Sequence, residues 1–92
     1  MMNNFNCDSR QLTTISRRQN GIKACRIKLI DSDRGLLLVA PSGDTFYMKP
    51  RDIEVNDSYK KDVYVDCVLY TMNGQVFSAK FVGVTPAKFI PE

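Results

Sequence analysis

The chain has 92 residues, of which 43% are hydrophobic and 25% are charged, and its formal net charge is +3. These totals are typical of a single globular domain, which we assign to residues 1–92. The absence of histidine removes the commonest general base and the commonest transition-metal ligand, so we predict a protein that is not an enzyme and uses no metal or cofactor.

Residues 9–20 fit two structures. As a helix, the segment would end at a left-handed Gly21, with Arg17 and Arg18 in a last turn where they oppose the helix dipole. As a strand, it would form a hairpin through Asn20-Gly21, and the β-branched run 13–15 favours this state. We expect the strand, and the helix is the alternative.

The segment 22–30 alternates apolar and basic side chains, which is typical of a half-buried strand. Cys25, Ile27 and Leu29 would point into the core. Arg26 and Lys28 would point to solvent, so this strand would present a cationic outer face.

Two further strands are expected before residue 50. Residues 36–40 form a continuous apolar run, and residues 45–49 alternate apolar and polar side chains. In the second of these strands, Phe46 and Met48 would lie inward, and Tyr47 and Lys49 outward. A connector over residues 50–55 would then insert Ile53 and Val55 into the core.

The strongest signal is the pair of extended segments that Asn73-Gly74 joins, because both residues of an Asn-Gly loop tolerate positive φ. This two-residue loop would set Tyr70 opposite Phe77. One face of the hairpin is mostly aliphatic and the other carries aromatic residues. The sequence leaves open which face is the core.

Strands at this spacing, joined by short links, indicate a mainly β protein. We predict a small antiparallel meander of five to six strands that curls into a barrel-like shape to hide its edges. If residues 9–20 are helical, one N-terminal helix is added and the class becomes α+β.

Basic residues concentrate in the first third of the chain, where residues 1–30 hold six of them and a single acidic residue, Asp8. Such asymmetry points to an anionic partner, although a solvated outer face without a partner is the other interpretation. Four of the six are arginines, which bind phosphates and carboxylates in a bidentate manner. The candidate partner- or RNA-binding residues are Arg10, Arg17, Arg18, Lys23, Arg26 and Lys28, and the candidate aromatic anchors are Tyr47, Tyr64 and Tyr70.

The three cysteines, Cys7, Cys25 and Cys67, are widely spaced and odd in number. This pattern indicates reduced thiols rather than a disulfide framework. The longest apolar run is far too short to span a bilayer. We therefore expect a cytoplasmic protein without membrane contact, which would act in the bacterial host cytoplasm if a phage encodes it.

The basic stretch Arg10–Lys28, the aromatic hairpin Tyr64–Phe81 and the lack of a catalytic set together resemble phage-encoded anti-CRISPR proteins that act on type I surveillance complexes. The resemblance covers the whole chain, and no family residue is transferred through it. It implies a non-enzymatic inhibitor that binds a host RNA-guided complex, through protein subunits and guide RNA. Such an inhibitor would block target DNA recognition or nuclease recruitment.

Two other functions remain open. The chain could be a small β-barrel that binds nucleic acid directly as a regulator, or an assembly protein that forms homo-oligomers. No small-molecule substrate is expected.

Overall fold

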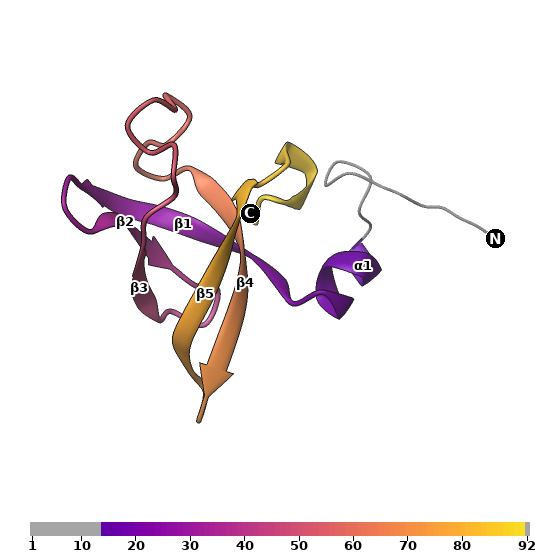
Figure 1. Cartoon of the computed structure of the whole chain (residues 1–92). Helices are drawn as coiled ribbons and strands as arrows, with labels where there is room; N and C mark the ends of the chain where they lie inside the picture. Colours follow the sequence, from indigo (N-terminus) through magenta and orange to yellow (C-terminus); the bar gives the residue numbers. More distant parts are fainter. Residues whose placement is uncertain (1–13, 92) are drawn as a thin grey trace.

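The computed structural model describes residues 14–91 (Figure 1). Its helices are α1 (Thr14–Gln19) and the 3₁₀ helix η2 (Ala87–Phe89), and its strands are β1 (Ile22–Asp31), β2 (Gly35–Val39), β3 (Thr45–Met48), β4 (Tyr64–Met72) and β5 (Gln75–Val84). The strands form one antiparallel sheet, which confirms the predicted mainly β class. Within the described residues, no helix is long and apolar enough to cross a membrane.

The sheet has the strand order β3-β2-β1-β4-β5 and curls into a half-barrel (Figure 1). The central strand β1 pairs with β2 on one side and with β4 on the other. The edge strands β3 and β5 approach each other, and the Asp44 carboxylate accepts a hydrogen bond from the Val76 N–H at 3.2 Å. Because β3 and β4 lie on opposite sides of β1 in the strand order, the chain crosses the sheet between them.

The core lies on the inner side of the curled sheet and is formed by side chains from one face of each strand. Six of its side chains are fully buried: Cys25, Ile27, Leu36, Leu38, Val65 and Cys67. Because Val65 and Cys67 belong to the aliphatic face of β4, that face is the core face of the hairpin. Phe46 and Met48 also pack against this core, as predicted.

A β-bulge in β1 changes which of its residues face the core. The register shifts between Ile27 and Leu29, so Leu29 pairs with Leu37 on the outer face of the sheet and is 41% exposed. The prediction that Leu29 points inward is therefore wrong. A bulge increases the local strand twist, and this twist helps the sheet to curl.

The β4–β5 hairpin turns at Asn73-Gly74 as predicted, with φ angles of 55° and 80°. The predicted register is wrong beyond the first pairs, because two irregularities add residues on β5. Tyr70 pairs with Ser78, and the Phe77 side chain is displaced from the expected pair and is 62% exposed.

Residues 14–19 form a helix, so the expected strand is wrong in this part, while residues 9–13 lie outside the described residues. Gly21 has a φ of 70°, which is the left-handed conformation that the helical alternative requires. A tertiary contact outweighs the local strand propensity, because Arg17 on α1 forms a buried ion pair with Asp66 on β4.

The connector between β3 and β4 follows the prediction in part. Ile53 packs against the core, whereas Val55 is 81% exposed. Residues 51–55 form turns, in which side chains two positions apart need not share a face.

Candidate functional site

A groove with basic walls lies beside the second half of β1. Its volume is about 760 Å³, and its lining residues, which we call the basic groove, are Arg26, Lys28, Leu29, Ile30, Lys61 and Asp62. Three of the six carry positive charge and one carries negative charge. The groove therefore favours an anionic ligand.

The backbone around the groove is held by hydrogen bonds between β1 and the end of the β3–β4 loop. The Ile27 N–H donates to the Val63 carbonyl at 2.8 Å, and the Asp62 N–H donates to the Ile27 carbonyl at 2.8 Å. Asp62 has a φ of 72°, a left-handed conformation that directs the chain from the loop into β4. These contacts bring Lys61 beside Arg26 and Lys28.

A buried tyrosine fixes the same loop to the sheet. Tyr59 is 7% exposed, packs edge-to-face against Phe81 with ring centroids 5.7 Å apart, and donates its hydroxyl hydrogen to Asp52 at 2.8 Å. Burial and the nearby carboxylate raise the pKa of Tyr59 to about 12, because both disfavour the phenolate. The loop that carries Lys61 is thus anchored two residues before it.

The cations of the groove are available to a ligand. Arg26 pairs with Asp62 at 3.3 Å, but the two side chains are 37% and 66% exposed, and exposed ion pairs contribute only about 0–1 kcal/mol. Lys28 and Lys61 are exposed and form no ion pair within residues 14–91. A phosphate or carboxylate could therefore bind all three without breaking a strong contact.

An apolar row continues from the groove across the outer face of three strands. Leu29 on β1 pairs with Leu37 on β2, and Leu37 pairs with Tyr47 on β3, so these three residues, the apolar row, lie side by side. The Arg34 guanidinium stacks over the Tyr47 ring, 4.3 Å from its centroid. Because Leu29 lines both, the groove and the row are one continuous surface.

The turn between β1 and β2 positions Arg34. The Asp31 carboxylate accepts hydrogen bonds from the backbone N–H groups of Asp33 and Arg34, at 2.8 and 2.9 Å, as an Asx-type turn does. These two bonds hold the pKa of Asp31 below its ordinary value. At Gly35, where φ is 92°, a Cβ atom would lie 2.5 Å from the Met48 carbonyl oxygen, so only glycine fits.

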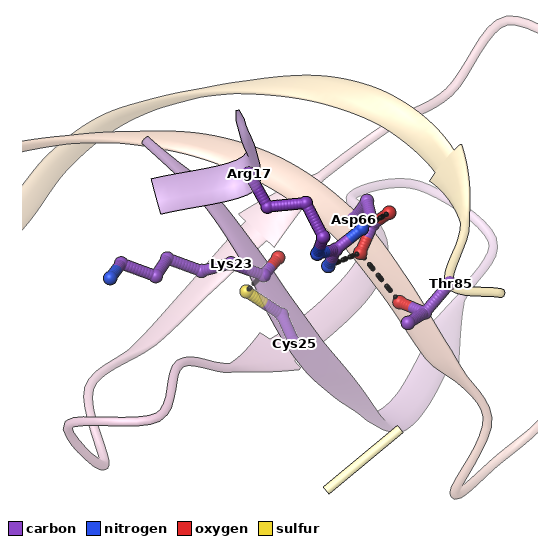
Figure 2. A network of polar contacts seen from close by, with 5 residues as sticks. All are labelled: Arg17, Lys23, Cys25, Asp66 and Thr85. Carbon is purple, nitrogen blue, oxygen red and sulfur yellow. Dashed lines mark hydrogen bonds and ion pairs between the residues drawn. The ribbon is translucent and has the colours of Figure 1, made fainter. Parts of the chain in front are cut away.

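Arg17, a predicted binding residue, is not part of this surface. It is 7% exposed, and its two terminal nitrogens donate to the two oxygens of Asp66 at 2.7 and 2.6 Å (Figure 2). The Thr85 hydroxyl donates to the same carboxylate at 2.9 Å, and the Phe89 ring lies 4.3 Å from the guanidinium carbon. Arg17 therefore joins α1, β4 and the C-terminal segment inside the protein, and the structure does not place it with the exposed cations.

The other predicted cations do not form one cluster. Arg18 is exposed on α1, and Arg10 lies outside the described residues. Lys23 points away from the Arg17–Asp66 pair (Figure 2) and lines a second groove of about 480 Å³ beside the β2–β3 and β4–β5 turns. Of the five predicted residues within 14–91, the structure brings only Arg26 and Lys28 together.

The three candidate tyrosines have different surroundings. Tyr47 belongs to the apolar row, and Tyr64 pairs with Arg26 and lines a hollow of about 300 Å³ with it. Tyr70 is 47% exposed on the β4–β5 hairpin and lines neither the basic groove nor this hollow. Tyr47 and Tyr64 therefore lie near the basic groove, and Tyr70 does not.

Sequence reasoning missed Lys61 and Arg34, which lie in the acid-rich middle of the chain. Lys61 reaches the groove because β4 pairs with β1 in antiparallel fashion, and Arg34 reaches Tyr47 because β3 pairs with β2. The Lys60-Lys61 pair shortly before a strand indicated a second basic site in the sequence. Only the strand order shows that Lys61 lies beside Arg26 and Lys28.

Two cysteines, Cys25 and Cys67, lie in the core as fully buried free thiols. A hydrogen bond between them raises the pKa of the Cys67 thiol, as burial also does, and the same bond lowers the pKa of the Cys25 thiol. Among residues 14–91, no three cysteine or acidic side chains are grouped so that they could hold a metal ion.

The chain was compared with known proteins in three ways. No protein-family model matches it. No curated protein and no solved structure matches it either.

Proposed function

We propose that this protein is a non-enzymatic binding protein that contacts nucleic acid through the basic groove. The observation that supports this proposal most directly is the convergence of Arg26, Lys28 and Lys61 in one hollow with a single carboxylate. Neutralisation of phosphates by Lys and Arg supplies most of the affinity of non-specific nucleic-acid binding. The groove has this chemistry and lies on backbone fixed by hydrogen bonds.

A charge-neutralising triple variant tests the proposal: Arg26→Gln with Lys28→Gln and Lys61→Gln. Arg18→Gln with Lys80→Gln and Lys88→Gln is the matched control, because it removes the same charge from exposed positions outside the groove. Binding of fluorescent random-sequence oligonucleotides at low salt should weaken on the order of 10- to 100-fold in the groove variant only. If both variants bind equally weakly, the affinity depends on net charge, and the proposal that the groove is the binding site is rejected.

The resemblance to anti-CRISPR proteins gives a second candidate, an inhibitor of a host RNA-guided surveillance complex. The β4–β5 hairpin favours it, because Tyr70, Met72 and Phe77 are 47%, 61% and 62% exposed and could supply the apolar centre of a protein interface. In that case the basic groove would contact guide RNA. The reduced thiols and this ligand class support a cytoplasmic location.

A binding assay with purified guide-loaded complex separates the two candidates. The inhibitor should bind the complex and reduce hybridisation of target DNA or recruitment of the nuclease, while binding free oligonucleotides weakly. A direct nucleic-acid-binding protein should bind free oligonucleotides without any host protein. Tyr70→Ala with Phe77→Ala should weaken binding of the complex only.

A further inference from the structure

We infer that the ligand of this surface is single-stranded nucleic acid, with phosphates in the basic groove and unpaired bases on the apolar row. The inference rests on the proposed function and adds to it a ligand class and the residues that recognise it. Its starting observation is that two kinds of surface, one cationic and one apolar, share Leu29 and form one continuous face.

The apolar row offers a stacking ring, Tyr47, beside two aliphatic side chains. Leu29 and Tyr47 are 41% and 38% exposed, and Leu37 between them is half-buried. Aromatic rings and arginine planes stack on bases without selecting a sequence, because every base has a π-face. Tyr47 with Arg34 supplies both groups in a single stack.

The Arg34 guanidinium can accept a base on its outer side. It lies over the Tyr47 ring at 4.3 Å, and its side chain remains 63% exposed. Its ion pair with Asp31, at 3.2 Å, is also exposed and therefore weak. A base could stack on Arg34 and extend the tyrosine–arginine stack, or it could replace Arg34 on the ring.

A duplex would use only half of this face. Its phosphates could contact Arg26, Lys28 and Lys61, but its bases are stacked on each other, so the apolar row would stay exposed to water. A single strand can place phosphates and bases on the two parts at once. Charge complementarity in the groove and stacking on the row therefore both favour the unpaired ligand.

The experiment compares the binding of a fluorescent oligothymidylate of about 16 nucleotides, the upper end of the usual site size, with the binding of a duplex of equal length. Tyr47→Ala is the test variant, Tyr47→Phe keeps the ring, and Tyr70→Ala removes an exposed tyrosine outside the face. We expect the wild type to prefer the single strand. Tyr47→Ala should weaken single-strand binding about 10-fold and leave duplex binding unchanged.

The controls separate stacking from folding and from charge. Tyr47→Phe and Tyr70→Ala should bind the single strand as the wild type does, and all variants should show similar Tm values. The inference is overturned if the wild type binds single strand and duplex equally and Tyr47→Ala changes neither affinity. If the groove triple variant then weakens binding of both nucleic acids, the proposed function is retained. Binding of neither nucleic acid by the wild type at low salt would overturn both.

Discussion

Two arginines of the same basic stretch, Arg17 and Arg26, have opposite roles in the structure. Arg17 is 7% exposed and holds the Asp66 carboxylate with two hydrogen bonds inside the protein. The Arg26 side chain is 37% exposed and pairs with Asp62 through one contact of 3.3 Å in the basic groove. The difference shows that burial and hydrogen-bond geometry decide whether a cation is held inside the fold or stays available at the surface.

The energetic reason is desolvation. A buried charge that loses its partner cannot regain water, so the Arg17–Asp66 pair must stay formed. An exposed pair exchanges its partner with water at little cost, so Arg26 can leave Asp62 for a phosphate. Variants at the two arginines and along β1 should therefore differ in stability and in ligand binding.

The largest effect is expected at the buried pair. Arg17→Ala leaves Asp66 without its main partner and should lower the free energy of unfolding by about 3–5 kcal/mol, measured by urea titration. Arg18→Ala, on the exposed side of the same helix, should change it by less than about 0.5 kcal/mol. A double change of Arg17→Met with Asp66→Val should recover much of the loss, because no buried charge remains.

An Arg17→Ala variant as stable as Arg18→Ala would contradict this assignment. It would mean that α1 is not held to β4 by the ion pair. Arg17 would then be open to a ligand, as the sequence predicted.

Substitutions on the two sides of β1 should change the free energy of unfolding by different amounts. Ile27 is fully buried, and Ile27→Ala should lower the free energy of unfolding by about 2–5 kcal/mol. Leu29→Ala, on the outer side of the bulge, should lower it by less than about 1 kcal/mol and should weaken ligand binding instead. Equal destabilisation by the two variants would place Leu29 in the core and remove it from the apolar row.

A smaller, pH-dependent effect is expected at Tyr59, which anchors the loop that carries Lys61. Tyr59→Phe should lower the free energy of unfolding by about 1 kcal/mol near neutral pH, because the hydrogen bond to Asp52 is lost. The pKa of Tyr59 is raised from 10.0 to about 12 in the folded state, so between these values the unfolded chain loses the proton first. The stability of the wild type should therefore fall as pH rises above 10.

The variant lacks this phenol, so the difference in stability between wild type and Tyr59→Phe should shrink from about pH 7 to about pH 11. Urea unfolding of both proteins at each pH measures it. A constant difference would show that the Tyr59 hydroxyl titrates alike in the folded and unfolded states.

Local sequence signals predicted much of the sheet. Alternation placed Phe46 and Met48 inward and Tyr47 outward, and the Asn73-Gly74 pair gave the hairpin turn. Each of these features depends on residues that are neighbours in the chain. The bulges in β1 and β5 depend on the twist that the curled sheet needs, so local alternation could not place Leu29 or Phe77.

The candidate site could be predicted only in part for a related reason. Arg26 and Lys28 belong to one strand, and alternation put both on its outer side. Arg17 and Asp66 are 49 positions apart, so nothing in the N-terminal segment showed that Arg17 has an internal partner. Lys61 joins the groove through the pairing of β4 with β1, which the sequence did not reveal.

The salt dependence of single-strand binding in single-charge variants shows directly whether phosphates occupy the basic groove. Each phosphate contact should contribute about −0.7 to the slope of log affinity against log salt concentration. Lys28→Gln and Lys61→Gln should each reduce the magnitude of the slope by about this amount, while Arg18→Gln and Lys88→Gln leave it unchanged. Slopes that change with Arg18 and Lys88, and not with Lys28 and Lys61, would contradict the account.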